Sequence, residues 1–127
     1  MANTVEVQTL INGPRNLILK VHIDGDGSGE ETNKLIVDVS LYDCSEVSIK
    51  HVQGSFSGFT AELLWDAAVN THAFNVPDYD VDQDFCSFGG LINNAGAGKT
   101  GDIVMTTTGL GNGDTGHLVL KMKKRGG

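Results

Sequence analysis

Several short segments carry residue types that bind ions. The segment 24–31 (DGDGSGEE) places oxygen-bearing side chains on alternate residues with glycine between them, as in a calcium-binding loop. An EF-hand loop requires a glutamate at its twelfth position, which is Leu35 here, and it also requires flanking helices. We therefore expect a polar loop between strands, with a weak calcium site of another kind through Asp24, Asp26 and Glu30 as the alternative.

Residues 93–100 (NNAGAGKT) end like a phosphate-binding loop. Asn93 replaces the first glycine of the pattern G-x-x-x-x-G-K-[ST], and phosphate binding also needs a strand before the loop and a helix after it. The residues that follow, Gly101 to Val104, predict a turn and a strand. Nucleotide binding is therefore not expected.

Four aspartates, Asp78, Asp80, Asp82 and Asp84, alternate with other residues. In an extended segment their side chains share one face, where like charges repel unless water, a cation or a basic partner separates them. Paired carboxylates also serve glycosidases, but that chemistry needs a cleft with a perturbed acid, and an aromatic content of 6% leaves few rings to bind a sugar. Solvation is the default expectation, and Asp78, Asp80 and Asp82 are candidate partner contacts.

Nucleophilic and metal-binding patterns are absent from the sequence. The four histidines, His22, His51, His72 and His117, share no short spacing, and no G-x-S-x-G segment occurs. Cys44 and Cys86 lack zinc-ligand spacing and the local signatures of catalytic cysteines. They are expected to be small unpaired residues, with a disulfide as the alternative. We expect no enzymatic activity and no cofactor.

The net charge of the chain is acidic, which limits the classes of partner that it is expected to bind. Nine Lys and Arg against 16 Asp and Glu give a net charge of −7, so binding to nucleic acid through phosphate neutralisation is not expected. The C-terminal end is basic, and it is either a solvated, frayed tail or a contact with an acidic partner. The cations of this end are Lys121, Lys123, Lys124 and Arg125.

The sequence contains neither a membrane-span pattern nor an export signal. No run approaches the roughly 20 apolar residues of a membrane span, and the first residues lack the features of a signal peptide. Membrane association is not expected, and we expect the protein in the cytoplasm or in a particle assembled there.

Apolar residues recur with period two along most of the chain, which is typical of half-buried antiparallel strands. Helix signal is weak. About eight or nine strands are predicted, around Val5 and Val7, within 17–23, 35–41, 47–49, 59–65, 72–76, 84–90 and 103–107, and around Leu118, Leu120 and Met122.

Turn residues separate these segments, and the longest span without clear strand signal runs from Pro77 to Lys99. A functional loop is expected there. Strands of this number and length predict a single all-β domain over residues 1–127, built as an antiparallel two-sheet β-sandwich or jelly roll, with a short N-terminal arm and a basic C-terminal tail.

Three segments together resemble small virion structural proteins of tailed bacteriophages. They are residues 5–26 (VEVQTLINGPRNLILKVHIDGD), the strand end Trp65-Asp66, and residues 89–121 (GGLINNAGAGKTGDIVMTTTGLGNGDTGHLVLK). The resemblance covers roughly half of the chain and implies a capsid decoration or cement protein on the outer face of the head shell, with no catalytic residues.

If the resemblance holds, the partners are the major capsid protein and other copies of this chain, in a homotrimer or another symmetric oligomer. Candidate contacts lie in the N-terminal segment, the long loop and the C-terminal segment. They are Val5 and Val7, then Asp78, Asp80 and Asp82, then Lys121, Lys123, Lys124 and Arg125. The alternative is a calcium- or carbohydrate-binding β-sandwich module of a phage tail or adhesin.

Overall fold

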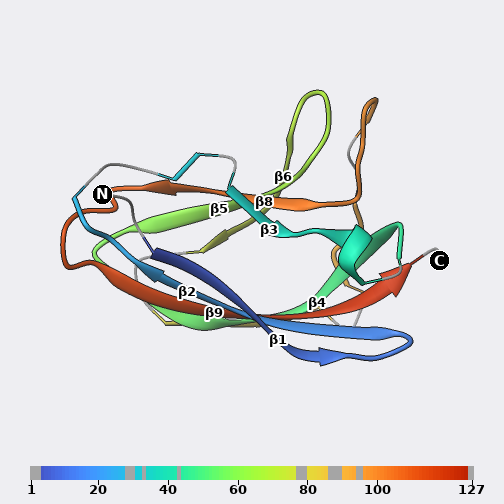
Figure 1. Ribbon diagram of the computed structural model, residues 1–127, viewed down its shortest axis with the longest axis horizontal. Coiled ribbons are helices and arrows are strands. Elements are labelled where there is room, and N and C mark those ends of the chain that lie inside the picture. Colours follow the sequence, from blue (N-terminus) through green and yellow to red (C-terminus); the bar gives the residue numbers. More distant parts are fainter. Residues whose placement is uncertain are drawn as a thin grey trace.

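The computed structural model describes residues 4–27, 31–32, 34–42, 44–76, 80–85, 90–93 and 96–125. In these residues nine strands form two antiparallel sheets that pack face to face (Figure 1). In spatial order, the five-stranded sheet contains β1 (Thr4–Asn12), β2 (Asn16–Asp24), β9 (Thr115–Arg125), β4 (Glu46–Ser57) and β7 (Asp80–Asp84). The four-stranded sheet contains β3 (Lys34–Val37), β8 (Ile103–Thr108), β5 (Thr60–Trp65) and β6 (Thr71–Val76), and a 3-10 turn, η1 (Val39–Leu41), follows β3.

The strand order is that of a jelly roll. Without β1, the order β2-β9-β4-β7 lies against the order β3-β8-β5-β6. Every connection passes from one sheet to the other except the β1–β2 and β5–β6 connections, and this winding places strands distant in the sequence side by side. The predicted all-β, two-sheet architecture is confirmed, and the strand order selects the jelly roll from the two predicted forms.

The predicted alternation builds the core. Leu17, Leu19, Val21 and Ile23 of β2 are completely buried, while the residues between them are only partly covered. Trp65 of β5 lies in the same core at 1% exposure. Each such side chain contributes about 1.5–3 kcal/mol relative to an exposed one, so the two sheets are held together mainly by these inward residues.

Two predicted segments differ in the structure. A strand at Asp80–Asp84 lies inside the span expected to be a long loop, because backbone pairing with β4 and one buried residue, Val81, are enough to form it. Most of the strand predicted within 84–90 lies outside the described residues, which omit 86–89. The strand predicted within 35–41 ends at Val37. The carboxylate of Asp38 accepts the Ser40 backbone N–H at 3.1 Å and caps η1.

The basic C-terminal residues continue a central strand. β9 runs to Arg125 between β2 and β4, with Lys123 opposite Asn16 on one side and Ser48 on the other. Residues 121–123 are thus paired on both sides and residues 124–125 with β4, so a frayed tail does not occur within the described part of the chain. The start of β1 and the end of β9 lie at opposite ends of the sandwich (Figure 1).

Candidate interaction surfaces

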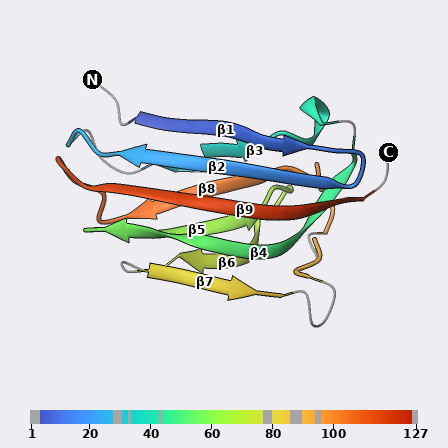
Figure 2. The ribbon, with the colours of Figure 1, turned by 90° about the horizontal axis from the view of Figure 1, so that it is seen from below.

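Strand β1 extends beyond the smaller sheet. It pairs only with β2 among the described residues and forms one margin of the five-stranded sheet, with β7 at the other margin (Figure 2). Because the facing sheet has four strands, most of β1 is left uncovered: Val5 still packs against the core, but Val7 is 38% exposed. The predicted contact residues Val5 and Val7 therefore lie in a paired strand, and Val7 is accessible.

We call the exposed apolar residues of β1, which are Val7, Leu10 and Ile11, the β1 margin. Leu10 is 44% exposed and Ile11 is 49% exposed, next to a β-bulge between Thr9 and Ile11. The phenol oxygen of Tyr42 lies 3.3 Å from the hydroxyl of Thr9, which places η1 beside this strand. Exposed apolar groups on an edge strand are a common basis for pairing with another chain.

The basic residues of β9 gather with those of the β1–β2 hairpin at one end of the sandwich. Lys121 lies opposite Ile18 of β2, and the Lys124 backbone N–H donates to the carbonyl of Arg15 at 2.7 Å. We call Arg15, Lys121, Lys123 and Lys124 the basic end, and the backbone of Arg125 continues β9 there. In a chain of net charge −7, this end is a local positive region that can contact an acidic surface.

The opposite margin is acidic. Asp80, Asp82 and Asp84 lie on alternate residues of β7, all exposed, as the spacing predicted, whereas Asp78 lies outside the described residues. Asp82 pairs with the ring of His51 on β4. At least one carboxylate of this row therefore contacts a side chain of the same sheet.

A groove of about 770 Å³ runs between the margins β6 and β7. Its polar lining includes Glu62, Asp80 and Asp82, and its apolar lining includes Phe74 and Val81. The carboxylate of Glu62 accepts a hydrogen bond from Nδ1 of the His72 ring at 2.7 Å. Carboxylates above an apolar base can bind polyhydroxyl or cationic groups.

Two loops project together from the outer face of the four-stranded sheet (Figure 1). They are residues 66–70 after β5 and residues 96–102 before β8. The backbone N–H of Asp66 donates to the Asp102 carbonyl at 3.0 Å, and Ala68 N–H donates to the Ala97 carbonyl at 3.1 Å. These bonds extend the β5–β8 pairing, so we call the two loops the paired-loop projection.

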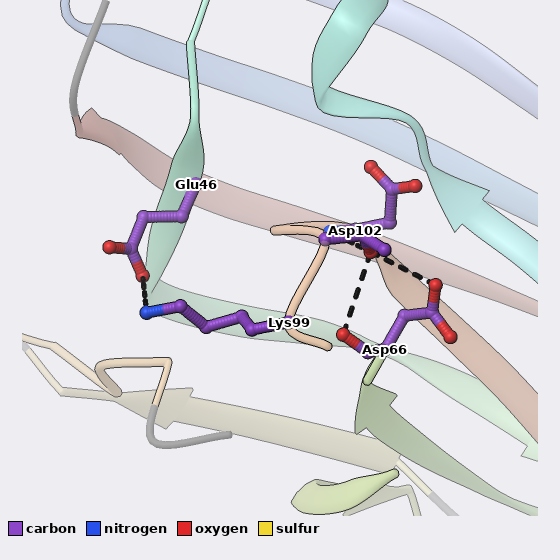
Figure 3. Close-up of polar contacts among 5 residues, drawn as sticks. Glu46, Asp66, Lys99 and Asp102 are labelled. Atoms are coloured by element: carbon purple, nitrogen blue, oxygen red, sulfur yellow. Dashed lines mark hydrogen bonds and ion pairs between the residues drawn. The ribbon is translucent and has the colours of Figure 1, made fainter. Parts of the chain in front are cut away.

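Charged side chains brace the base of the projection (Figure 3). The Thr100 hydroxyl donates to the carboxylate of Asp66 at 2.9 Å, and Lys99 Nζ lies 3.6 Å from the carboxylate of Glu46. The Lys99-Thr100 pair that resembled a phosphate-binding loop therefore serves contacts within the chain. No helix follows it, in agreement with the expectation from the sequence.

Asp102 is held in a partly desolvated position beside the projection. Its carboxylate accepts the Val39 backbone N–H at 3.0 Å. Burial raises the pKa of Asp102 above its usual value, and the carboxylates of Asp38 and Asp66 raise it further, while the bonds from Val39 and Thr100 oppose the shift. Asp102 also lines a shallow pocket of about 740 Å³, together with Leu35, Leu64 and Val104.

The residues of the predicted calcium site are only partly brought together. The carboxylate of Asp24 accepts a hydrogen bond from the ring of His22 at 3.0 Å, Asp26 is half-buried, and Glu30 lies outside the described residues. No group of three or more His, Cys, Asp or Glu side chains within the described residues is arranged to hold a metal ion.

The histidines form surface pairs that spacing alone did not reveal. His22 pairs with the carboxylate of Asp24, two residues along the same strand. His51 and His72 pair with Asp82 and Glu62, which lie on neighbouring strands. The exposed β1 margin was also missed, because its exposure depends on the unequal number of strands in the two sheets. The only available signal was the run of apolar residues Val7, Leu10 and Ile11 with a single charge, Glu6, in the strand.

No family model, curated protein or solved structure matches this chain. No helix in the described part of the chain is long and apolar enough to cross a membrane.

Proposed function

We propose that this protein is a non-enzymatic structural protein of a bacteriophage virion, a capsid decoration protein that binds the outer head shell and connects major capsid protein subunits. The resemblance of residues 5–26 and 89–121 to phage virion proteins is the ground for naming the particle. The jelly roll is compatible with this role, because that fold recurs in viral capsid proteins, although fold alone does not determine function.

The observation that carries the proposal is the contrast between surfaces and interior. The core is apolar and the described residues contain no converging set of metal-ligating groups, whereas apolar, basic and acidic regions lie separately on the β1 margin, the basic end and β7. A rigid body with several distinct contact regions is suited to joining neighbouring subunits, and repeated copies on a shell add their weak contacts through avidity.

We assign the capsid contact to the basic end, because its charge is opposite to that of the rest of the chain. Lys123 is exposed and Lys121 is half-buried on the outer face of β9, and neither forms an ion pair with a carboxylate among the described residues. An acidic patch on the shell is then the matching surface.

Binding to head shells tests this proposal. The purified protein, mixed with shells of the encoding phage that lack it, is expected to co-sediment at low salt, and Lys121→Glu with Lys123→Glu is expected to weaken binding at least tenfold. The matched comparison uses the single changes Lys123→Glu and Lys34→Glu, which alter the net charge equally, and Lys34 lies on β3 of the other sheet. Failure of the native chain to co-sediment, or equal loss for the two single changes, contradicts the assignment.

One observation favours the alternative, a calcium- or carbohydrate-binding module. The groove between β6 and β7 is lined by Glu62, Asp80 and Asp82, and Asp26 follows Asp24, the last residue of β2, by two positions. A ligand present at 100 times its dissociation constant raises the free energy of unfolding by about 2.7 kcal/mol. A rise in melting temperature with calcium, or with a simple sugar, supports this alternative, and no shift with either contradicts it.

A further inference from the structure

The outer edges of the two sheets differ in how well they resist pairing with another chain. β7 carries exposed aspartates, β3 has only four residues and begins with Lys34, and β6 has six residues. β1 has nine residues, one charge, no Pro and no Gly. Its bulge next to Leu10 is the one protective feature of this edge, and the six residues before it pair regularly with β2.

The inward face of this regular part is only partly covered. Val5, Val7 and Thr9 point to the core side, because their partners on β2 are the buried Ile23, Val21 and Leu19. Val5 packs against the core and Thr9 contacts Tyr42, but Val7 between them remains 38% exposed. A strand added to β1 would therefore gain backbone hydrogen bonds and cover an apolar side chain.

A second copy of β1 fits this edge in one antiparallel register. A two-fold axis through Val7 places Val7 opposite Val7, Val5 opposite Thr9 and Glu6 opposite Gln8, so inward residues meet inward residues. An axis through Glu6 would place two carboxylates opposite each other, and an axis through Gln8 would extend the pairing across the bulge at Leu10.

Charge complementarity also selects this register. Gln8 lies opposite Lys20 of β2, so Glu6 of the second copy, Gln8 and Lys20 form one row on the outer face of the joined sheet. Two strand spacings, about 9.6 Å, separate the backbones of that glutamate and of Lys20, a gap that these long side chains span. The two-fold axis repeats the pair, which gives two Glu6–Lys20 attractions in each dimer.

We propose that the protein forms a two-fold dimer through antiparallel β1–β1 pairing centred on Val7, which joins two five-stranded sheets into one. The dimer concerns the free protein and does not depend on the virion role. Its interface is isologous, so it closes after two copies and forms no fibre through this edge.

Mass measurement and cross-linking test the dimer. Light scattering of the native full chain at increasing concentration is expected to show the mass of two chains, and Val7→Lys is expected to shift the dissociation constant at least tenfold, because it places two ammonium groups on the axis. The control Gln53→Lys adds the same charge to the exposed face of the interior strand β4 and is expected to leave the dimer intact. Circular dichroism confirms that each variant is folded.

The register is tested in a chain whose two native cysteines are replaced by serine. Opposite Cα atoms of an antiparallel pair lie about 4.5–5.5 Å apart, within the range of a disulfide, so Val7→Cys is expected to oxidise to a covalent dimer. Val5→Cys places the two thiols about 14 Å apart and is expected to remain uncrosslinked. A monomeric native chain, a dimer unaffected by Val7→Lys, or equal cross-linking at both positions overturns the proposal.

Discussion

At Asp102 a single carboxylate connects the paired-loop projection to η1. Its Oδ1 accepts the Val39 N–H, while burial and the carboxylates of Asp38 and Asp66 disfavour its charge. Because its pKa is raised on folding, the stabilising contribution of this group is present at pH values below its unfolded pKa and is lost as the pH rises through its folded pKa. The charged form at neutral pH therefore destabilises the native state relative to the neutral form.

We predict that Asp102→Asn raises the melting temperature at pH 7. The amide oxygen still accepts the Val39 N–H, and the variant carries no charge to desolvate. The difference from the native chain is expected to shrink as the pH falls through the titration range of Asp102, which thermal melts at several pH values measure.

A second substitution separates charge from hydrogen bonding. Asp102→Ala removes the charge but leaves the Val39 N–H without this acceptor, and it is expected to be less stable than Asp102→Asn by about 1–3 kcal/mol. A lower melting temperature for Asp102→Asn at pH 7, or a difference independent of pH, contradicts the account.

The sequence predicted the arrangement of one group of acidic side chains but not of the other. The alternation of Asp80, Asp82 and Asp84 predicted their shared face, because only an extended backbone was needed. The carboxylate group around Asp102 was not predicted, because Asp38 and Asp66 reach it from other elements and only the β3–β8–β5 pairing brings them near.

At the scale of elements, glycines in the turns set the paths between strands. Gly101, just before β8, has φ +88°, and a Cβ there would lie 1.9 Å from the carbonyl oxygen of Ser45. Gly113 has φ +86° with open space around it, and Gly96 has open space without a positive φ. The three positions separate backbone strain from steric overlap.

We predict a graded series of destabilisation for alanine at these glycines. Gly96→Ala is expected to change the free energy of unfolding by less than about 0.5 kcal/mol. Gly113→Ala is expected to cost about 1–2 kcal/mol for the left-handed backbone, and Gly101→Ala more, because the Ser45 carbonyl must also move. Urea denaturation measures the series, and equal costs at Gly113 and Gly101 would show that the overlap has no effect.

Periodicity predicted the elements that are buried on one face. β2, β5 and the middle of β9 were predicted closely because their inward residues are apolar, as in Leu17 to Ile23 and Leu118 to Met122, whereas the basic last residues of β9 were expected to form a tail. β7 was missed because Val81 is its single core residue, and its pairing with β4 is a backbone property that side-chain patterns do not show. The exposure of β1 was missed for a related reason, since it depends on which strand of the other sheet lies opposite.

At the scale of the whole molecule, stability is unevenly distributed between interior and margin. β9 lies at the centre of the larger sheet, and Leu118, Leu120 and Met122 are at most 2% exposed. β1 pairs on one side only within the described residues, and Leu10 is 44% exposed. Backbone amides of β9 are thus expected to open only when the whole domain unfolds, and the unpaired amides of β1 to open far more easily.

We predict that Leu120→Ala lowers the free energy of opening of the slowest-exchanging amides by about 2–5 kcal/mol. The decrease is expected to be the same for amides in β2, β4 and β9. The uniform change follows because these strands pair in one ladder across a single core, so their slowest amides exchange through one common unfolding event. Leu10→Ala removes the same atoms from the exposed margin and is expected to change those amides by less than about 0.5 kcal/mol. Native-state hydrogen exchange measures both variants, and a change at Leu120 confined to β9 would show that the sheets open separately.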